Sequence, residues 1–535
     1  MESSKQSIRP GAGTGEAPAE TGWLNDRLRT VLAIAPEAGA IEYHGVWDSW
    51  GDLSAGASRT AAVLEAASGE AEVMALVSRN KPSHIAVILG GLLSDRCVAM
   101  VNGHQPPERL AEDLRRMAPA VIVIHQDDLG PRIAEAIAAV GATTIITGDR
   151  AAELTSRDAS GPATARERKP GVAIQMLTSG TTGPAKRVDL RRASLEASIW
   201  NLFPGNWIKD AEGRFALRST VGMLDGPISH MGGIWYALLA LVEGRPLVLL
   251  DKFSVEPWVD AVRRHRPKRV RLVPAAIRMI MEAAPPVEAL ESIQAVTCGT
   301  APLPPALQEQ FEETYNLTVL PSYGATEFSG AICAWTMESR RQFGRSKSGS
   351  CGRAIAGTEL RVADVDSGKP LGLNRIGVLQ LRSNQLGQSE WLSTTDLAEI
   401  DEDGFVYIRG RTDHAINRGG FKILPNDIAD VLRREDAVAD VAVVGLPDER
   451  LGEAPAAAVL CAQGKTVDVA RLYALCRSAL LPYQQPVLIA VMDDFPRTAS
   501  LKPDLPRVRD YLVAFRSGSD LAEGKTIGGP PPGWR

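Results

Sequence analysis

MLTSGTTGPAKRV, residues 176–188, is the segment of this chain in which backbone freedom and charge point most directly to a ligand. Gly180 and Gly183 free the backbone to curl and let its N–H groups approach a ligand closely. Such N–H groups, nearby hydroxyls and the charge of Lys186 together form a concavity for anionic oxygens. The apolar run 172–177 reads as a strand that leads into the loop. We therefore predict a polyphosphate-binding loop, with hydroxyls from Thr178, Ser179, Thr181 and Thr182.

This loop is not a Walker A motif. That motif needs four residues between its glycines and ends in Gly-Lys-Ser/Thr. Here Thr181 and Thr182 separate the glycines, and proline and alanine precede the lysine. The alternative is an ordinary Ser/Thr/Gly surface turn. The coincidence of a strand, two glycines, hydroxyls and a lysine favours the phosphate loop.

The string TSGTTGPAK resembles the phosphate-loop signature of the adenylate-forming superfamily. That superfamily includes acyl-CoA synthetases, luciferases and the adenylation domains of peptide synthetases. One loop alone does not establish a family.

Composition is typical of an ordinary globular protein rather than a nucleic-acid or membrane protein. The chain has 535 residues, more than one hydrophobic core usually supports, so two or more domains are expected. A net charge of −5 gives no reason to expect nucleic acid or an anionic membrane as a partner. The six cysteines are scattered and form no Cys-x-x-Cys pair, so we expect neither disulfides nor structural zinc. With no secretory signal and no membrane span in the sequence, we expect a cytoplasmic protein.

The pattern of apolar runs predicts an α/β fold. Runs at 73–77, 85–93 and 121–124, taken as strands, alternate with helical patterns such as 107–117, as in parallel-sheet βαβ units. Further strands are predicted at 247–250, 269–273 and 295–298. Short β-rich runs at 359–362 and 377–382 predict a small antiparallel unit.

We expect a large body followed by a small α+β domain. In the C-terminal part the pattern predicts helices at 427–434 and 469–479 and strands at 439–445 and 487–491. The predicted division is a flexible leader at 1–22, a large N-terminal body at 23–410, a small C-terminal domain at 411–515 and a disordered tail at 516–535.

Two segments resemble the nucleotide-binding motifs of the superfamily. LPSYGATEFSG, residues 320–330, resembles the YGxTE motif. An aromatic ring can stack on a purine, and a carboxylate suits Mg²⁺ shared with phosphates. The resemblance implies that Tyr323 stacks on adenine beside Gly324, that Thr326 contacts phosphate and that Glu327 holds magnesium. Upstream, a segment resembling GGAPL implies that the adenine or substrate neighbours are Gly299, Thr300, Ala301 and Pro302.

Asp396 and Arg411 are candidate ribose-binding residues. A carboxylate can chelate the two hydroxyls of a ribose through short, strong hydrogen bonds. The family pattern is Thr-Gly-Asp, and this chain has Thr-Thr-Asp, with Thr395 in the glycine position. Arg411 matches the arginine that contacts ribose and phosphate in the family. Each residue alone reads equally well as a solvated surface charge.

The C-terminal motifs imply a moving domain. Asp413 falls at the hinge position of the family, and His414 stands where aspartate is common. Gly419 and Gly420 resemble the glycines beside which a pantetheine arm passes. PRTASLK, residues 496–502, resembles a signature that ends in a catalytic lysine, here Lys502, although Leu501 replaces the usual glycine. An isolated lysine on the surface is the alternative.

DGPISHMGGI, residues 225–234, resembles the wall between the acyl pocket and the thiol tunnel. His230 matches the aromatic or histidine residue of that wall, although a lone histidine is often structural. Gly232 and Gly233 leave room beside it, which favours a bulky, aromatic or medium- to long-chain acid. The family resemblance as a whole implies four catalytic residues, which are Lys502, Glu327, Thr182 and His230.

Together the motifs imply an ATP-dependent acyl-CoA synthetase that uses Mg²⁺, ATP and coenzyme A. It would form an acyl-adenylate from a small-molecule carboxylic acid and pass the acyl group to the CoA thiol. An amide synthetase or a carrier-protein loading ligase remains an alternative, because Thr395 and Leu501 depart from the pattern. A degenerate nucleotide-binding protein without turnover is a second alternative. We expect a homodimer from the frequency of that arrangement among enzymes.

Overall fold

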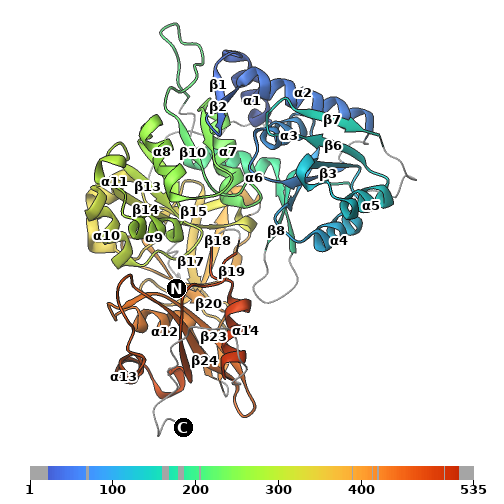
Figure 1. Cartoon of the computed structure of the whole chain (residues 1–535). Helices are drawn as coiled ribbons and strands as arrows, with labels where there is room; N and C mark the ends of the chain where they lie inside the picture. The colour runs from blue at the N-terminus through green and yellow to red at the C-terminus, as the bar shows by residue number, and fades with distance from the viewer. Residues whose placement is uncertain are drawn as a thin grey trace, which may run out of the picture.

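A seven-stranded sheet, whose central strands are buried on both faces, forms the first layer of the body (Figure 1). The computed structural model describes residues 22–67, 72–158, 168–178, 186–203, 207–387, 389–412, 414–418, 421–498 and 501–516. Along β3, Met74 and Leu76 pack on one side of the sheet, whereas Ala75 and Val77 pack on the other. Burial on both faces explains why its strands read as continuous apolar runs.

This sheet has the order β7-β6-β5-β3-β4-β8-β9. Its central strands are parallel, and β7 and β9 close its two edges in antiparallel fashion. The strands are β3 (Val73–Ser78), β4 (Cys97–Asn102), β5 (Val121–His125), β6 (Thr143–Thr147), β7 (Leu154–Arg157), β8 (Val172–Thr178) and β9 (Lys186–Arg191). The covering helices are α1 (Trp23–Ile34), α2 (Trp50–Ala67), α3 (Pro82–Leu93), α4 (Pro107–Met117) and α5 (Pro131–Val140).

The prediction of a strand at 85–93 is wrong, because these residues belong to helix α3. Residues 82–92 are all buried, so the helix is apolar around its whole circumference and shows no helical periodicity. Pro82 at its first turn is the signal that distinguishes it from a strand.

Two smaller sheets complete the α/β part of the body. One has the order β10-β11-β1-β2 and the other the order β12-β13-β14-β15-β16. Their strands are β1 (Gly39–Tyr43), β2 (Val46–Ser49), β10 (Gly222–Leu224), β11 (Leu247–Leu249), β12 (Arg269–Leu272), β13 (Ala295–Cys298), β14 (Thr318–Ala325), β15 (Gly330–Ala334) and β16 (Arg353–Ala354). Their helices are α6 (Arg192–Leu202), α7 (Met231–Val242), α8 (Val255–His265), α9 (Pro274–Ala283), α10 (Pro305–Tyr315) and α11 (Met337–Phe343).

An antiparallel sheet follows where short β-rich runs were predicted. Its strands, in order, are β17 (Thr358–Ala363), β18 (Gly377–Ser383), β19 (Leu392–Ile400) and β20 (Val406–Arg411). It packs its own apolar cluster around Leu379 and Leu381, which are fully buried. The predicted α/β fold class with a small β-rich unit is confirmed.

The C-terminal part has its own sheet and its own core. It comprises β21 (Ile416–Arg418), β22 (Phe421–Ile423), α12 (Pro425–Leu432), β23 (Val438–Asp448), β24 (Gly452–Cys461), α13 (Val469–Ala479), β25 (Leu488–Met492) and α14 (Leu505–Arg516). Helices α12 and α13 cover one face of the sheet and α14 covers the other. It lies against the body (Figure 1), where Arg278 of α9 reaches the Ala439 carbonyl and Asp440. The predicted domain limits at 410 and 515 remain a proposal, supported by these separate cores.

Candidate active site

Tyr323, Asp396 and Arg411 form one side of the candidate site. Tyr323 lies near the end of β14, and its hydroxyl donates a hydrogen bond of 2.6 Å to Asp396 Oδ2 on β19. Asp396 and Arg411 are paired residues of β19 and β20, and Arg411 Nη1 lies 3.7 Å from Asp396 Oδ1. Burial and the adjacent Asp396 charge raise the pKa of Tyr323, so its phenol stays protonated. Three residues far apart in sequence therefore meet as the motifs imply.

The backbone around Asp396 accommodates threonine in the family's glycine position. The Thr395 carbonyl accepts hydrogen bonds from the Thr412 backbone N–H at 2.7 Å and from the Thr412 hydroxyl at 3.1 Å. The Thr395 side chain is exposed. Because only its backbone is used, this departure leaves the Asp396 carboxylate in place.

Thr300 adopts a backbone conformation that favours glycine. Its φ is 79°, in the left-handed region where a β-branched residue is strained. Its hydroxyl accepts a hydrogen bond of 2.9 Å from Arg271. Beside it, a Cβ at Gly299 would lie 2.9 Å from Ser322 Oγ, so that glycine keeps β13 close to β14. Ala301 and Pro302 follow in the same loop, which leads to α10.

Lys502 enters the site from the C-terminal part. It is half-buried, and its pKa is lowered by burial and by the charge of Arg411, while Asp396 and Glu327 act in the opposite direction. Leu501 packs against the core cluster of the body that contains Trp258 and Phe311. The φ of Leu501 is 62°, which explains the family's glycine at this position. Leu501 therefore contacts the body directly beside Lys502, the residue that lies among the other site residues.

His230 borders the same site at the N-terminus of α7. Burial, together with the charge of Lys502, lowers the pKa of His230 to about 4, so the ring is neutral at pH 7. Its buried Nε2 has no hydrogen-bond partner among the described residues. A buried nitrogen without a hydrogen-bond partner is available to bind a ligand.

The glycines after His230 do not leave the space that the sequence suggested. A Cβ at Gly232 would collide with the guanidinium of Arg271, and a Cβ at Gly233 would collide with the Pro227 carbonyl oxygen. The room beside Gly232 is thus filled by an arginine side chain. These glycines give no support to a bulky acid.

Glu327 fits the magnesium role by its donor chemistry. It lies on a short 3₁₀ helix, η3 (Thr326–Phe328), that directly follows β14 and contacts β9. Thr326 begins this helix, and β9 begins at Lys186. Mg²⁺ is usually held by one or two carboxylates together with substrate phosphates. The described residues contain no cluster of three or more metal-ligating side chains.

The pairing of two strands explains why residue 324 is a glycine. A Cβ there would collide with the Gly330 carbonyl oxygen across the irregular pairing of β14 and β15.

Several predicted site residues lie outside the described residues. They are the loop residues Ser179, Gly180, Thr181, Thr182 and Gly183, the hinge Asp413, and the glycines Gly419 and Gly420. Thr178 is described only as the last residue of β8.

Sequence and fold comparisons support this arrangement. The family described as AMP-binding enzyme matches residues 28–389, and the AMP-binding enzyme C-terminal domain matches residues 427–502. The chain belongs to the AMP-binding enzyme family. The resemblance drawn from the sequence motifs is confirmed.

Named CoA ligases are among its relatives. It is 28% identical to a probable CoA ligase, CCL5, of Humulus lupulus over 63% of each chain. It is also 28% identical to the peroxisomal OPC-8:0-CoA ligase 1 of Arabidopsis thaliana, over 63% of this chain and 64% of that relative. These matches span slightly less than two thirds of the relatives' own length. The fold matches ATP-bound MatB from Rhodopseudomonas palustris with a TM-score of 0.78 and 23% identity, over 92% of this chain and 99% of that one.

This AMP-binding family member has two site residues that the sequence reasoning did not select. Arg271 lies near the end of β12, and Asp225 follows β10. Burial raises the pKa of Asp225 to about 7, although the charge of Arg271 opposes the shift. The signal for Arg271 was an arginine in an apolar strand, within VRLV at 270–273. A charge at such a position needs a partner or a ligand.

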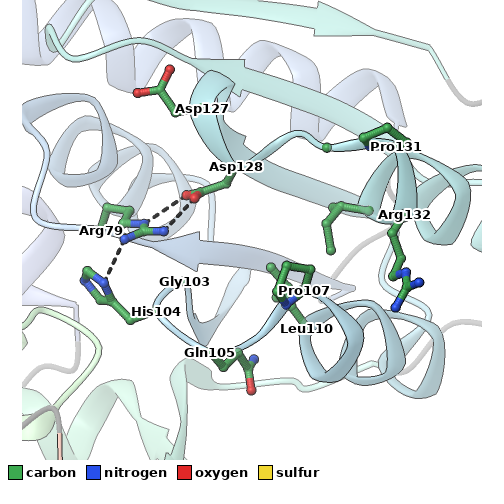
Figure 2. A pocket seen from close by; sticks show the side chains of 12 residues that line it. Arg79, Gly103, His104, Gln105, Pro107, Leu110, Asp127, Asp128, Pro131 and Arg132 are labelled. Carbon is green, nitrogen blue, oxygen red and sulfur yellow. Dashed lines mark hydrogen bonds and ion pairs between the residues drawn. The ribbon is translucent and has the colours of Figure 1, made fainter.

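An open pocket also lies away from these residues, at the carboxyl ends of β3, β4 and β5 (Figure 2). Arg79 donates to Asp128 at 2.6 and 2.9 Å and contacts His104 at 2.7 Å there. No site residue predicted from the sequence lines it. Its lining residues are Arg79, Gly103, His104, Gln105, Pro107, Leu110, Asp127, Asp128, Gly130, Pro131, Arg132 and Ile133.

Across the described ranges, none of the helices combines the length and the apolar character needed to cross a lipid bilayer.

Proposed function

We propose that this protein is an AMP-forming acid–thiol ligase that activates a carboxylic acid with ATP and transfers the acyl group to coenzyme A. The observation that carries the proposal is the position of Lys502. This lysine of the C-terminal part shares an electrostatic environment with Glu327, Asp396 and Arg411 of the body, and it acts on His230 as well.

In the first half-reaction a carboxylate oxygen of the acid attacks the α-phosphorus of ATP, and the bond to the pyrophosphate oxygen breaks. Tyr323 would provide the adenine-stacking face, and Asp396 with Arg411 would hold the ribose. The Asp396 carboxylate is oriented for this by the hydrogen bond that it accepts from the Tyr323 hydroxyl, while the backbone N–H of Asp396 donates to Thr394 Oγ1. The products are an acyl-adenylate and pyrophosphate.

Lys502 would stabilise the negative charge that builds up on the transferring phosphate and the incoming carboxylate. A fixed ammonium in a partly water-excluded site is effective for this purpose because solvent screens it little. Glu327 would hold Mg²⁺, which supplies charge neutralisation at the phosphates when bound. The loop at 178–186 is proposed to hold the β- and γ-phosphates as the leaving group.

In the second half-reaction the thiol sulfur of coenzyme A attacks the acyl carbon and its proton is released to solvent, while AMP leaves with the electron pair of the broken acyl carbon–oxygen bond. His230 is neutral because burial lowers its pKa to about 4, so it adds no charge at the wall where thiol and acyl group would meet. Gly419 and Gly420 are proposed to admit the pantetheine arm. A rotation about Asp413 would withdraw Lys502 between the two steps.

Acid-dependent exchange of labelled pyrophosphate into ATP tests this function. We expect exchange with at least one acid, and thioester formation when coenzyme A is added. Parallel reactions with amines and with a phosphopantetheinyl carrier protein test the alternative acceptors. The absence of exchange with every acid would contradict the ligase and favour a nucleotide-binding protein without turnover.

The finer expectations stay proposals. The cytoplasmic location and the homodimer rest on the arguments from the sequence alone. A bulky, aromatic or medium- to long-chain acid is not supported by Gly232, because the Arg271 guanidinium fills the space beside it.

A further inference from the structure

Gly232 leaves space for the guanidinium of Arg271 on the acid side of the site, which is the part formed by Asp225, His230, Arg271 and Thr300. The Arg271 side chain occupies the position that a Cβ at Gly232 would enter, and its Nη1 would lie 3.6 Å from a Cβ at Gly226. Both glycines belong to the segment that contains His230. A larger residue at position 232 would displace the guanidinium, so this wall is shaped around the arginine.

The surroundings of Arg271 are typical of a binding site in an α/β fold. Strands β12 and β13 are parallel, and Leu272 is paired with Cys298 at their carboxyl ends. Arg271 precedes that end of β12, and Thr300 follows the end of β13. Ligands of open α/β sheets bind beyond the carboxyl ends of the strands.

The donors of Arg271 are largely unused within the described residues. A guanidinium has five N–H donors, and one hydrogen bond is formed, to Thr300 Oγ1 at 2.9 Å. Among the residues that the structure describes, no carboxylate lies within the 4.0 Å of a salt bridge to Arg271. Asp225 acts on it only from farther away. Burial lowers the pKa of Arg271, which indicates a cation with incomplete compensation.

Arg271 and Lys502 stand in separate electrostatic environments. Besides burial, the pKa of Arg271 responds to Asp225, Cys298 and Tyr236, whereas that of Lys502 responds to Arg411, Asp396 and Glu327. His230 is linked to both cations. The charge of Lys502 lowers the pKa of His230, and the Arg271 guanidinium fills the space at Gly232, two residues after His230. The site thus offers two cations to two different parts of a substrate.

We propose that the acid substrate is a dicarboxylic acid, whose second carboxylate is bound by Arg271 while its first is activated near Lys502. Arginine binds a carboxylate through two parallel N–H···O bonds, and Arg271 has the donors for that geometry. The pairing would also compensate a half-buried charge that the described protein residues leave without a salt-bridge partner. This inference rests on the ligase function proposed above.

Matched pairs of acids test the proposal on the wild-type protein. Pyrophosphate exchange is measured with dicarboxylic acids from succinate to suberate and with the monocarboxylic acids of the same carbon number. We expect kcat/KM to favour the best dicarboxylic acid over its monocarboxylic partner by about ten- to a hundredfold, the usual effect of a charged hydrogen bond. A higher kcat/KM for the monocarboxylic partner of every pair would overturn the inference and leave the ligase standing. Exchange with none of the acids would overturn both.

Substitution of the arginine assigns the preference to this side chain. Arg271→Met should reduce the ratio between the paired acids to about one, mainly through KM, while Arg271→Lys should retain part of it. Arg269→Met removes an equal charge at an exposed position of the same strand and should leave the ratio unchanged. Equal loss for both acids in Arg271→Met would assign the residue to the reacting carboxylate and contradict the proposal. If Arg271→Met does not fold, Arg271→Lys and the wild-type ratio decide the matter.

Discussion

The two sides of the candidate site differ in how far the protein satisfies its own polar groups. On the nucleotide side, Tyr323, Asp396 and Arg411 already contact one another. On the acid side, His230 Nε2 and Asp225 Oδ2 are buried without hydrogen-bond partners among the described residues. The nucleotide side is therefore organised before its ligand binds, whereas the acid side depends on the ligand for its polar contacts. This difference predicts where substitutions act on binding and where they act on folding.

Lys502→Ala should have the largest effect, because it removes a C-terminal charge that acts on groups of both sides. We expect acid-dependent pyrophosphate exchange to fall about a hundred- to a thousandfold, as when an oriented charge is removed from a transition state. The melting temperature should change little. Exchange within a fewfold of wild type would contradict the proposed role of the lysine.

Asp225→Asn should change how stability depends on pH. The pKa of Asp225 is raised from 3.8 to about 7 by burial, so the folded state retains a proton that the unfolded state releases. The contribution of this residue to the free energy of unfolding therefore falls as pH rises from about 4 to about 7, by on the order of 3 kcal/mol, and is constant above. Urea unfolding at pH 5 and pH 8 should show a smaller difference in the variant than in wild type. An unchanged difference would show that Asp225 ionises normally.

Asp396→Asn tests whether the organised side binds nucleotide. Loss of the charge should raise the KM for ATP about ten- to a hundredfold, because charged hydrogen bonds to the ribose and to Tyr323 weaken. Glu399→Gln on the same strand is the matched control, since Glu399 pairs with Arg409 at 2.7 Å, outside the site. Similar effects of the two variants on KM would contradict the ribose assignment.

The neighbouring glycines of the acid side should respond differently to alanine. A Cβ at Gly233 meets the backbone of Pro227, which cannot move freely, so Gly233→Ala should destabilise the protein by about 1–3 kcal/mol. A Cβ at Gly232 meets the end of the flexible Arg271 side chain, so Gly232→Ala should cost less stability and instead raise the KM for the acid. Thermal unfolding and exchange kinetics on both variants separate these effects. Equal destabilisation would contradict the placement of Arg271.

The same difference explains what the sequence could predict. Tyr323, Asp396, Arg411 and Lys502 lie in short contiguous motifs, so each is recognisable from its neighbours. The acid side brings together residues from three segments, with Asp225 and His230 in one and residues 271 and 300 in the other two, and no local pattern links these segments. The meaning of Gly232 in particular could not be read locally, because the arginine that fills its space comes from another strand.

The secondary structure could be predicted only where the sequence carries a local signal. Strand β13 at Ala295–Cys298 and helix α13 at Val469–Ala479 have the predicted bounds, because turn residues or caps border them. Helix α3 was mistaken for a strand because uniform burial removes its periodicity. Thr300 and Leu501 stand where the family motifs have glycine, and both adopt the left-handed backbone and make contacts of their own.

The central claim is that Lys502 serves acid activation and not acyl transfer. The most direct test supplies Lys502→Ala with the preformed acyl-adenylate of the acid that drives exchange best, adds coenzyme A, and measures thioester formation against wild type. We expect a thioester rate within a fewfold of wild type, although the same preparation has lost pyrophosphate exchange. A thioester rate reduced as strongly as the exchange would contradict this claim.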